Sequence, residues 1–112
     1  MLSQKHRLSK SADVKKTTAR GRSFFNPYFI IKFTPDVKEV KITFITSVRV
    51  SKKAVERNRA KRLLRDELRK HVAKMKPGNY VIILRASATK AEGADLRTAL
   101  VKSLTSAKML QS

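Results

Sequence analysis

One stretch of the chain constrains its fold more than any other, because it carries dense positive charge and an apolar stripe together. Residues 52–70 include nine lysines or arginines and only three acidic residues. Ala60, Leu64 and Leu68 recur in this stretch at the spacing of one helix face. The pattern predicts a helix over residues 54–74 that packs on one side and presents cations on the other. An arginine-rich helix face of this kind is suited to binding phosphate groups.

The whole chain is strongly basic. Its 112 residues include 27 lysines and arginines against 8 aspartates and glutamates, which gives a formal net charge of +19. A field of this sign attracts nucleic acid or an anionic membrane surface. The length suits a single domain, residues 1–112, and we interpret residues 1–10 as a mobile basic arm.

Composition disfavours several classes of protein. There is no cysteine, which excludes disulfides and thiolate metal sites. The two histidines, His6 and His71, are far apart and form no metal-ligand pattern. No apolar run approaches the ~20 residues of a membrane span, and the first residues lack the apolar region of a signal peptide. We therefore expect a cytoplasmic protein whose partners include neither a membrane nor a small-molecule substrate.

A short helix is expected before the first strand. It covers residues 11–19, with Val14 and Thr18 facing the core. Gly21 follows it and is suited to the left-handed conformation that ends many helices.

Two strands are expected between this helix and the basic helix. Residues 28–33 alternate, with Phe29, Ile31 and Phe33 on one face and Tyr28 on the other. Residues 40–50 form a longer strand, and the polar loop between the two strands predicts a hairpin.

The last third of the chain predicts one strand and one helix. Residues 80–84 are apolar and β-branched, which is typical of a central strand covered on both faces. Thr89 and Glu92 have the spacing of a capping box, while Gly93 favours a later start, and the helix runs to about Lys108. Its predicted buried residues are Leu96, Ala99, Leu100, Leu104 and Ala107. The element order is thus α-β-β-α-β-α, an α+β fold of the α/β sandwich type with a small sheet.

The segment Val55–Arg65, with the sequence VERNRAKRLLR, resembles the "RNR" signature of the bacterial ribonuclease P protein subunit. The preceding residues 52–54 are similar to the lysine-rich lead-in of that family. Residues 7–13 resemble its N-terminal arm and first helix, and residues 21–29 resemble the segment that leads into its first strand. Residues 80–86 resemble the strand that follows the signature helix. The resemblance therefore extends over most of the chain.

The resemblance implies a topology and a role. The basic helix would make an unusual left-handed crossover between parallel strands of a mixed sheet, against the usual right-handed rule. The family's partners are the ribonuclease P catalytic RNA and precursor tRNA with its 5′ leader. In that enzyme the catalytic RNA removes the leader using Mg²⁺ that it mainly binds itself, and the protein holds leader and RNA in productive geometry.

The chain departs from the family at its leader-binding cleft. Val14, Thr18 and Lys32 occupy positions where the family commonly has aromatic residues, and the lead-in before the signature is short. Stacking on aromatic rings contributes roughly 1–3 kcal/mol per base in single-strand sites. We expect the cleft, formed by Val14, Thr18, Tyr28 and Lys32, to depend more on charge, unless Tyr28 or the pair Phe24–Phe25 supplies the aromatic surface.

Ten residues in and before the basic helix are the candidate RNA contacts: Arg49, Lys52, Lys53, Arg57, Asn58, Arg59, Lys61, Arg62, Arg65 and Arg69. The alternative is a solvated helix face. Helical spacing divides most of them into two adjacent rows, Arg57, Lys61 and Arg65 in one and Asn58, Arg62 and Arg69 in the other. Arg59 is rotated away and either contacts a different RNA surface or braces the fold. Asn58 either reads a base edge or 2′-hydroxyl or is structural.

No residues are arranged for catalysis by the chain itself. Among its acids only Asp66 and Glu67 are adjacent in sequence, and neighbours on a helix diverge. The sequence therefore predicts a binding module, with nuclease activity belonging to a ribonucleoprotein. The alternatives are a ribosomal or general RNA-chaperone protein, a protein-only nuclease and a peptide of the membrane surface.

Overall fold

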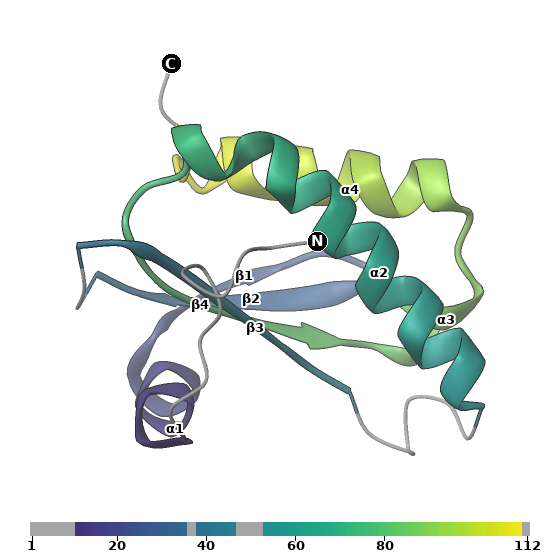
Figure 1. The fold of residues 1–112 in the computed structure, drawn as a ribbon, viewed down its shortest axis with the longest axis horizontal. Coiled ribbons are helices and arrows are strands. Elements are labelled where there is room, and N and C mark those ends of the chain that lie inside the picture. Colours follow the sequence, from purple (N-terminus) through teal and green to yellow (C-terminus); the bar gives the residue numbers. More distant parts are fainter. Residues whose placement is uncertain (1–10, 36–37, 47–52, 111–112) are drawn as a thin grey trace.

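The computed structural model describes residues 11–35, 38–46 and 53–110. Its elements are α1 (Ser11–Arg20), β1 (Arg22–Phe25), β2 (Phe29–Thr34), β3 (Val40–Ile45), α2 (Ala54–His71), the 3-10 turn η2 (Val72–Lys74), β4 (Gly78–Leu84), α3 (Ala86–Lys90) and α4 (Gly93–Ser106). The predicted α+β class with a small mixed sheet is confirmed (Figure 1). The expected arm, 1–10, and residues 47–50 of the predicted second strand lie outside the described residues.

The four strands form one sheet in the order β1-β2-β4-β3. β1, which the sequence pattern did not predict, pairs antiparallel with β2 around a turn in which the Asn26 side chain accepts hydrogen bonds from two backbone N–H groups. The predicted hairpin between β2 and β3 is wrong, because β4 lies between them. β4 is apolar on both faces and buried along almost its whole length, so the centre of the sheet removes most of its surface from water.

β3 and β4 run parallel, with Ile42 opposite Tyr80. Parallel neighbours need a connection that crosses back over the sheet, usually a helix of a dozen or more residues. α2 is that connection, and with η2 it covers the 54–74 range predicted from the sequence. The handedness of the crossover stays an expectation from the family resemblance.

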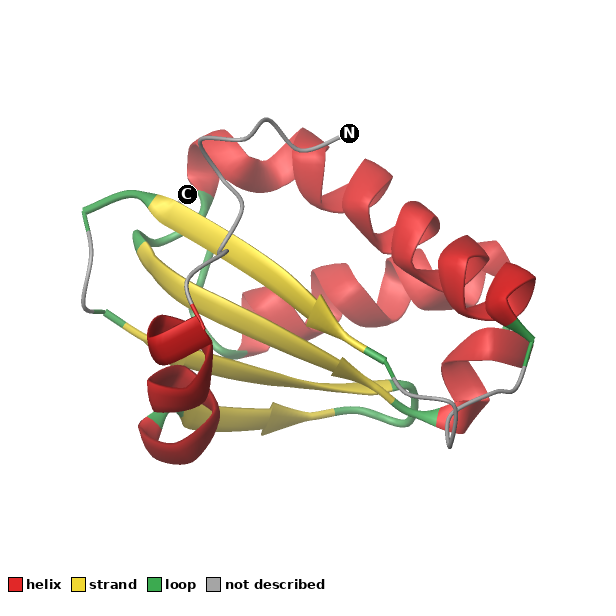
Figure 2. Cartoon of the chain, turned by 60° about the horizontal axis from the view of Figure 1, so that its bottom comes forward, coloured by secondary structure: helices red, strands yellow, loops and turns green. Residues whose placement is uncertain are grey.

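The helices divide between the two faces of the sheet. α2 and α4 cover one face and α1 lies on the other (Figures 1 and 2). Phe29, Ile31 and Phe33 of β2 are at most 2% exposed and point to the α2–α4 side, as their alternation predicted. They share a single core with Leu64 of α2 and Leu100 of α4.

α1 contacts the opposite face through a threonine pair. Val14 and Thr18, predicted to face the core, are only partly buried, and among residues 14–20 of α1 the fully buried one is Thr17. Its Oγ1 lies 3.1 Å from the Oγ1 of Thr34 in β2, which forms a buried hydrogen bond. The burial of Thr17 therefore depends on a polar partner, which a search for apolar residues misses.

Gly21 is required for a close approach and not for a left-handed cap, so that expectation was wrong. A Cβ at this position would lie 2.3 Å from the carbonyl oxygen of Thr17 and 3.0 Å from backbone atoms of Phe33. The missing side chain lets the end of α1 sit directly on β2.

The final helix starts later than its capping-box pattern suggested. Thr89 belongs to α3, where its hydroxyl donates to the carbonyl of Ala86 at 2.7 Å. α4 begins at Gly93, and Glu92 at its N-cap makes no side-chain cap hydrogen bond. The predicted capping box is therefore wrong, whereas the late start and the burial of Leu96, Leu100 and Leu104 are confirmed.

Gly78 provides a test of this packing. Its φ is +152°, and a Cβ there would lie 2.3 Å from the Phe33 ring and 2.6 Å from the carbonyl oxygen of Thr34. We predict that Gly78→Ala lowers the free energy of unfolding by ~1–3 kcal/mol in chemical denaturation. Gly93→Ala is the matched control, because its Cβ would make only ordinary contacts, with Leu63 at 3.7 Å and Arg97 Nη1 at 3.8 Å, and we expect it to be neutral or slightly stabilising. Equal stability of the two variants would contradict this account.

Candidate nucleic-acid interface

The apolar side of α2 determines where its cations point. Ala60, Leu64 and Leu68 are all 0% exposed, so the helix has one fixed rotation about its axis. Every other side chain on α2 is then directed by its angular distance from this stripe. The two rows predicted from helical spacing can therefore be located on the molecule.

The first row lies along the β3 side of α2. Arg57, Lys61 and Arg65 are each partly buried. The guanidinium of Arg65 sits 5.2 Å from the ring centroid of Phe44 in β3, a cation–π contact that holds this side chain against the sheet edge. The row is therefore anchored at one end while its charges stay at the surface.

The second row faces solvent. Asn58, Arg62 and Arg69 are all exposed. Lys53 precedes the helix as its N-cap residue, is exposed and supplies no side-chain cap to the first N–H groups. Together the two rows form a continuous cationic surface of α2, which we call the α2 cationic face: Lys53, Arg57, Asn58, Lys61, Arg62, Arg65 and Arg69.

Arg59 does not belong to this face. Its Nη2 donates a hydrogen bond to the carbonyl of Ala91, at 3.1 Å, in the segment between α3 and α4. Of the two roles that the sequence left open for Arg59, the structure supports the brace. Arg49 and Lys52, the remaining predicted contacts, lie outside the described residues.

The four residues predicted for the leader cleft do not lie together. Val14 and Thr18 belong to α1, and Lys32 points to the same face of the sheet that α1 covers. Lys32 donates a hydrogen bond to the hydroxyl of Ser23 in β1. Tyr28 instead packs against the core on the α4 side, where it lines a pocket with residues of that helix. Three of the four predicted residues therefore lie on α1 and the face of the sheet that α1 covers, whereas Tyr28 lies on the other side.

His71 has a structural role at the edge of the core. Its Nε2 lies 2.8 Å from Oε2 of Glu67, and Lys70 lies 3.6 Å from the other carboxylate oxygen. The hydrogen bond from His71, assisted by Lys70, lowers the pKa of the Glu67 carboxyl despite its partial burial. These contacts account for the one histidine in the described part of the chain.

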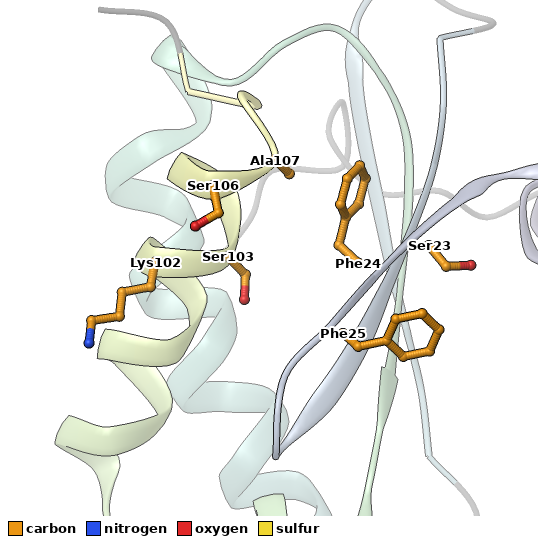
Figure 3. Close-up of a pocket in the computed structure, with 7 residues that line it drawn as sticks. All are labelled: Ser23, Phe24, Phe25, Lys102, Ser103, Ser106 and Ala107. Carbon is orange, nitrogen blue, oxygen red and sulfur yellow. The ribbon is translucent and has the colours of Figure 1, made fainter.

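A pocket that the sequence did not reveal lies between β1 and α4 (Figure 3). It has a volume of about 400 Å³ and is lined by Ser23, Phe24, Phe25, Lys102, Ser103, Ser106 and Ala107. Figure 3 shows the Phe24 ring directed toward α4, whereas Ser23 and the Phe25 ring point to the other side of the strand. Because Lys102 is its one charged lining residue, this pocket is a weaker candidate for RNA than the α2 cationic face.

The described residues contain no group of three or more histidine, cysteine, aspartate or glutamate side chains that could hold a metal ion. Within the same part of the chain, no helix is long and apolar enough to span a membrane. The feature that the structure does offer for recognition is positive charge arranged on a rigid helix.

Fold and site define a small basic α+β module that carries a cationic crossover helix on a four-stranded mixed sheet. The chain belongs to the ribonuclease P family, whose model, described as "Ribonuclease P", matches residues 2–108. A ribonuclease P protein component of Dehalococcoides mccartyi is 36% identical over 111 residues, which cover 97% of this chain and 90% of that protein. One from Xylella fastidiosa is 34% identical over 85 residues, covering 76% of this chain. The match spans 63% of the Xylella protein, less than two thirds of its length.

Solved structures of similar fold include the ribonuclease P proteins of Staphylococcus aureus and Thermotoga maritima. The first superposes with a TM-score of 0.85 over 95% of this chain and 98% of its own. The second has a TM-score of 0.74 over 86% and 92%. Each is 22% identical to this chain, so the likeness bears on the fold.

The separate role of Arg59 gives a testable contrast on one helix. We predict that Arg59→Ala lowers the free energy of unfolding by about 1 kcal/mol, because the Ala91 carbonyl loses its donor. Arg62→Ala, on the exposed row, should change stability by less than ~0.5 kcal/mol. In RNA binding the order should reverse, with Arg62→Ala the weaker binder. Thermal denaturation and filter binding measure the two effects, and a brace role for Arg59 is excluded if both variants unfold alike.

Proposed function

We propose that this chain is the protein subunit of a bacterial ribonuclease P. In this proposal it binds the catalytic RNA and the 5′ leader of precursor tRNA, and the RNA removes the leader by endonucleolytic cleavage. The observation that carries the proposal is the α2 cationic face, because a buried stripe fixes one row along the edge of β3 and the other toward solvent. Membership of the ribonuclease P family supports the same conclusion.

The proposed mechanism is electrostatic and positional. Arginine forks bind RNA phosphates with defined geometry, and each neutralised phosphate releases condensed counterions. Because α2 is packed against the core, phosphates bound to it are held at fixed positions relative to the sheet. The protein would thereby raise affinity for the substrate and lower the Mg²⁺ concentration that cleavage requires.

Mg²⁺ belongs to the catalytic RNA in this proposal. It would stabilise the charge that develops on the phosphate during cleavage. The residues of this chain act on the RNA phosphates and on the leader, and we assign none of them to the metal.

We assign the leader to the face of the sheet beside α1. Val14 and Thr18 border it on α1, and Lys32 supplies a cation on β2. None of these three positions offers an aromatic ring, and Lys32 is the one among them that carries a charge. The leader would therefore bind with a strong dependence on salt.

Replacing four cations of the face together tests the proposal. We predict that Arg57→Ala, Lys61→Ala, Arg62→Ala and Arg65→Ala in one variant weakens assembly with a ribonuclease P RNA. The slope of log affinity against log salt should become shallower, by about one for each phosphate that the variant no longer neutralises. The matched control replaces Lys74, Lys90, Arg97 and Lys102 by alanine, since these residues are exposed, lie outside α2 and carry the same total charge. An unchanged slope in the α2 variant refutes the assignment.

Cleavage at low Mg²⁺ tests the proposed role. A bacterial ribonuclease P RNA should process precursor tRNA at its correct 5′ end only when this chain is added. Acceleration by the control variant should equal that by the wild type. If the chain binds RNA without accelerating cleavage, a ribosomal or general RNA-chaperone role replaces the proposal. Cleavage by the chain without RNA would instead indicate a protein-only nuclease.

A further inference from the structure

The register of the sheet places an apolar row across the face opposite α2 and α4. Phe25 pairs with Ile30, Ile30 with Ile83, and Ile83 with Ile45, so the row crosses all four strands. Directly opposite residues share a face of the sheet, and this face is not the one that carries Phe29 and the core. The row formed by Phe25, Ile30, Ile83 and Ile45 therefore lies on the face of the sheet that points away from the core.

α1 covers a different part of this face. It is fixed by the Thr17–Thr34 hydrogen bond, and Thr34 pairs with Asn79 at the opposite end of β2 from Ile30. Phe25 accordingly remains 65% exposed, and the three isoleucines are partly exposed. Folding thus leaves an aromatic ring at the surface beside a row of partly covered apolar side chains.

Phe25 differs from the neighbouring Phe24 in the direction of its ring, in its packing and in its exposure. Figure 3 shows the rings of Phe24 and Phe25 on opposite sides of β1. Phe24 packs against the core, with the guanidinium of Arg22 at 5.5 Å from its ring centroid. Apart from Val55 on α2, Phe25 is the one large apolar side chain that is exposed in the described ranges. Its ring has no part in the core.

A cation lies one row away on the same face. Lys32 follows Ile30 by two residues, a distance of about 6.6 Å along an extended strand. The hydroxyl of Ser23, on the strand that carries Phe25, accepts its hydrogen bond and so holds the ammonium on the β1 side of the face. The Phe25 ring and the Lys32 ammonium therefore belong to adjacent rows of one face, about 6.6 Å apart at the backbone.

We propose that Phe25 is a base-stacking residue for an unpaired nucleotide of the 5′ leader, with Lys32 contacting the adjoining phosphate. The inference rests on the proposed function and names the group that binds the leader. Single-stranded RNA suits this surface because stacking on a ring accepts any base, and the chain's net charge of +19 attracts the backbone. The isoleucine row would support the next base along the strand.

Three substitutions at Phe25 separate stacking from simple apolar contact. In the complex with a ribonuclease P RNA, Phe25→Ala and Phe25→Leu should each weaken binding of precursor tRNA by about 5-fold or more. Phe25→Tyr should bind like the wild type, because it keeps the π-face. None of the three should alter binding of mature tRNA, which lacks the leader. The proposal fails if Phe25→Leu binds precursor tRNA as tightly as the wild type does.

A spectroscopic test is available because the chain contains no tryptophan. Phe25→Trp places a single fluorophore on the proposed platform, and its emission should be quenched when a single-stranded leader oligonucleotide binds. Thr105→Trp is the control, since Thr105 is exposed on α4, across the sheet, and its emission should not change. Absence of quenching at position 25 with leader bound overturns the proposal.

The two proposals fail in different ways. If the wild-type complex binds precursor and mature tRNA equally, the leader assignment of the proposed function is wrong and Phe25 loses its ligand. If the wild type prefers the precursor and Phe25→Ala keeps that preference, only the stacking role is wrong. Thermal denaturation of Phe25→Ala controls for folding, and we expect little change because the ring is mostly exposed.

Discussion

The burial of three small or branched side chains on α2 is the constraint on which the rest of the molecule depends. Ala60, Leu64 and Leu68 have no exposed surface, so the helix fits the sheet in one orientation only. That orientation directs two rows of cations outward and turns Arg59 toward the segment before α4. Recognition therefore follows from core packing, because the same contacts that stabilise the fold determine which charges an RNA can reach.

The core also has to hold together a chain whose charges repel one another. A net charge of +19 on 112 residues favours expansion at low ionic strength. Contacts such as that of Arg65 with Phe44 attach a guanidinium to apolar surface without neutralising it. A polyanion that binds the folded chain offsets the repulsion and stabilises it by linkage, so folding and RNA binding support each other.

Local sequence patterns predicted the positions of helices and strands better than they predicted which strands pair. The α2 stripe and the doubly apolar β4 were predicted correctly, because each has its own periodicity over many residues. β1 has only four residues, too few for a pattern, and the pairing of β2 with β4 joins segments far apart in the chain. At the site, helical spacing predicted both cationic rows and the divergence of Arg59. The separation of Tyr28 from Lys32 could not be predicted, because it depends on where β2 begins.

The position of β4 has a consequence for how the protein is made. β4 is the last strand in the sequence and yet lies between β2 and β3, both of which precede α2. Until residues 78–84 have been synthesised, β2 can pair only with β1 and β3 has no strand to pair with, so α2 has no complete sheet on which to bury its stripe. Pairing between distant segments is slow to form, since the intervening chain must first be ordered. The residues of α2 are therefore synthesised before the sheet that fixes the orientation of the helix is complete. The chain can present its α2 cationic face only after β4 has been translated.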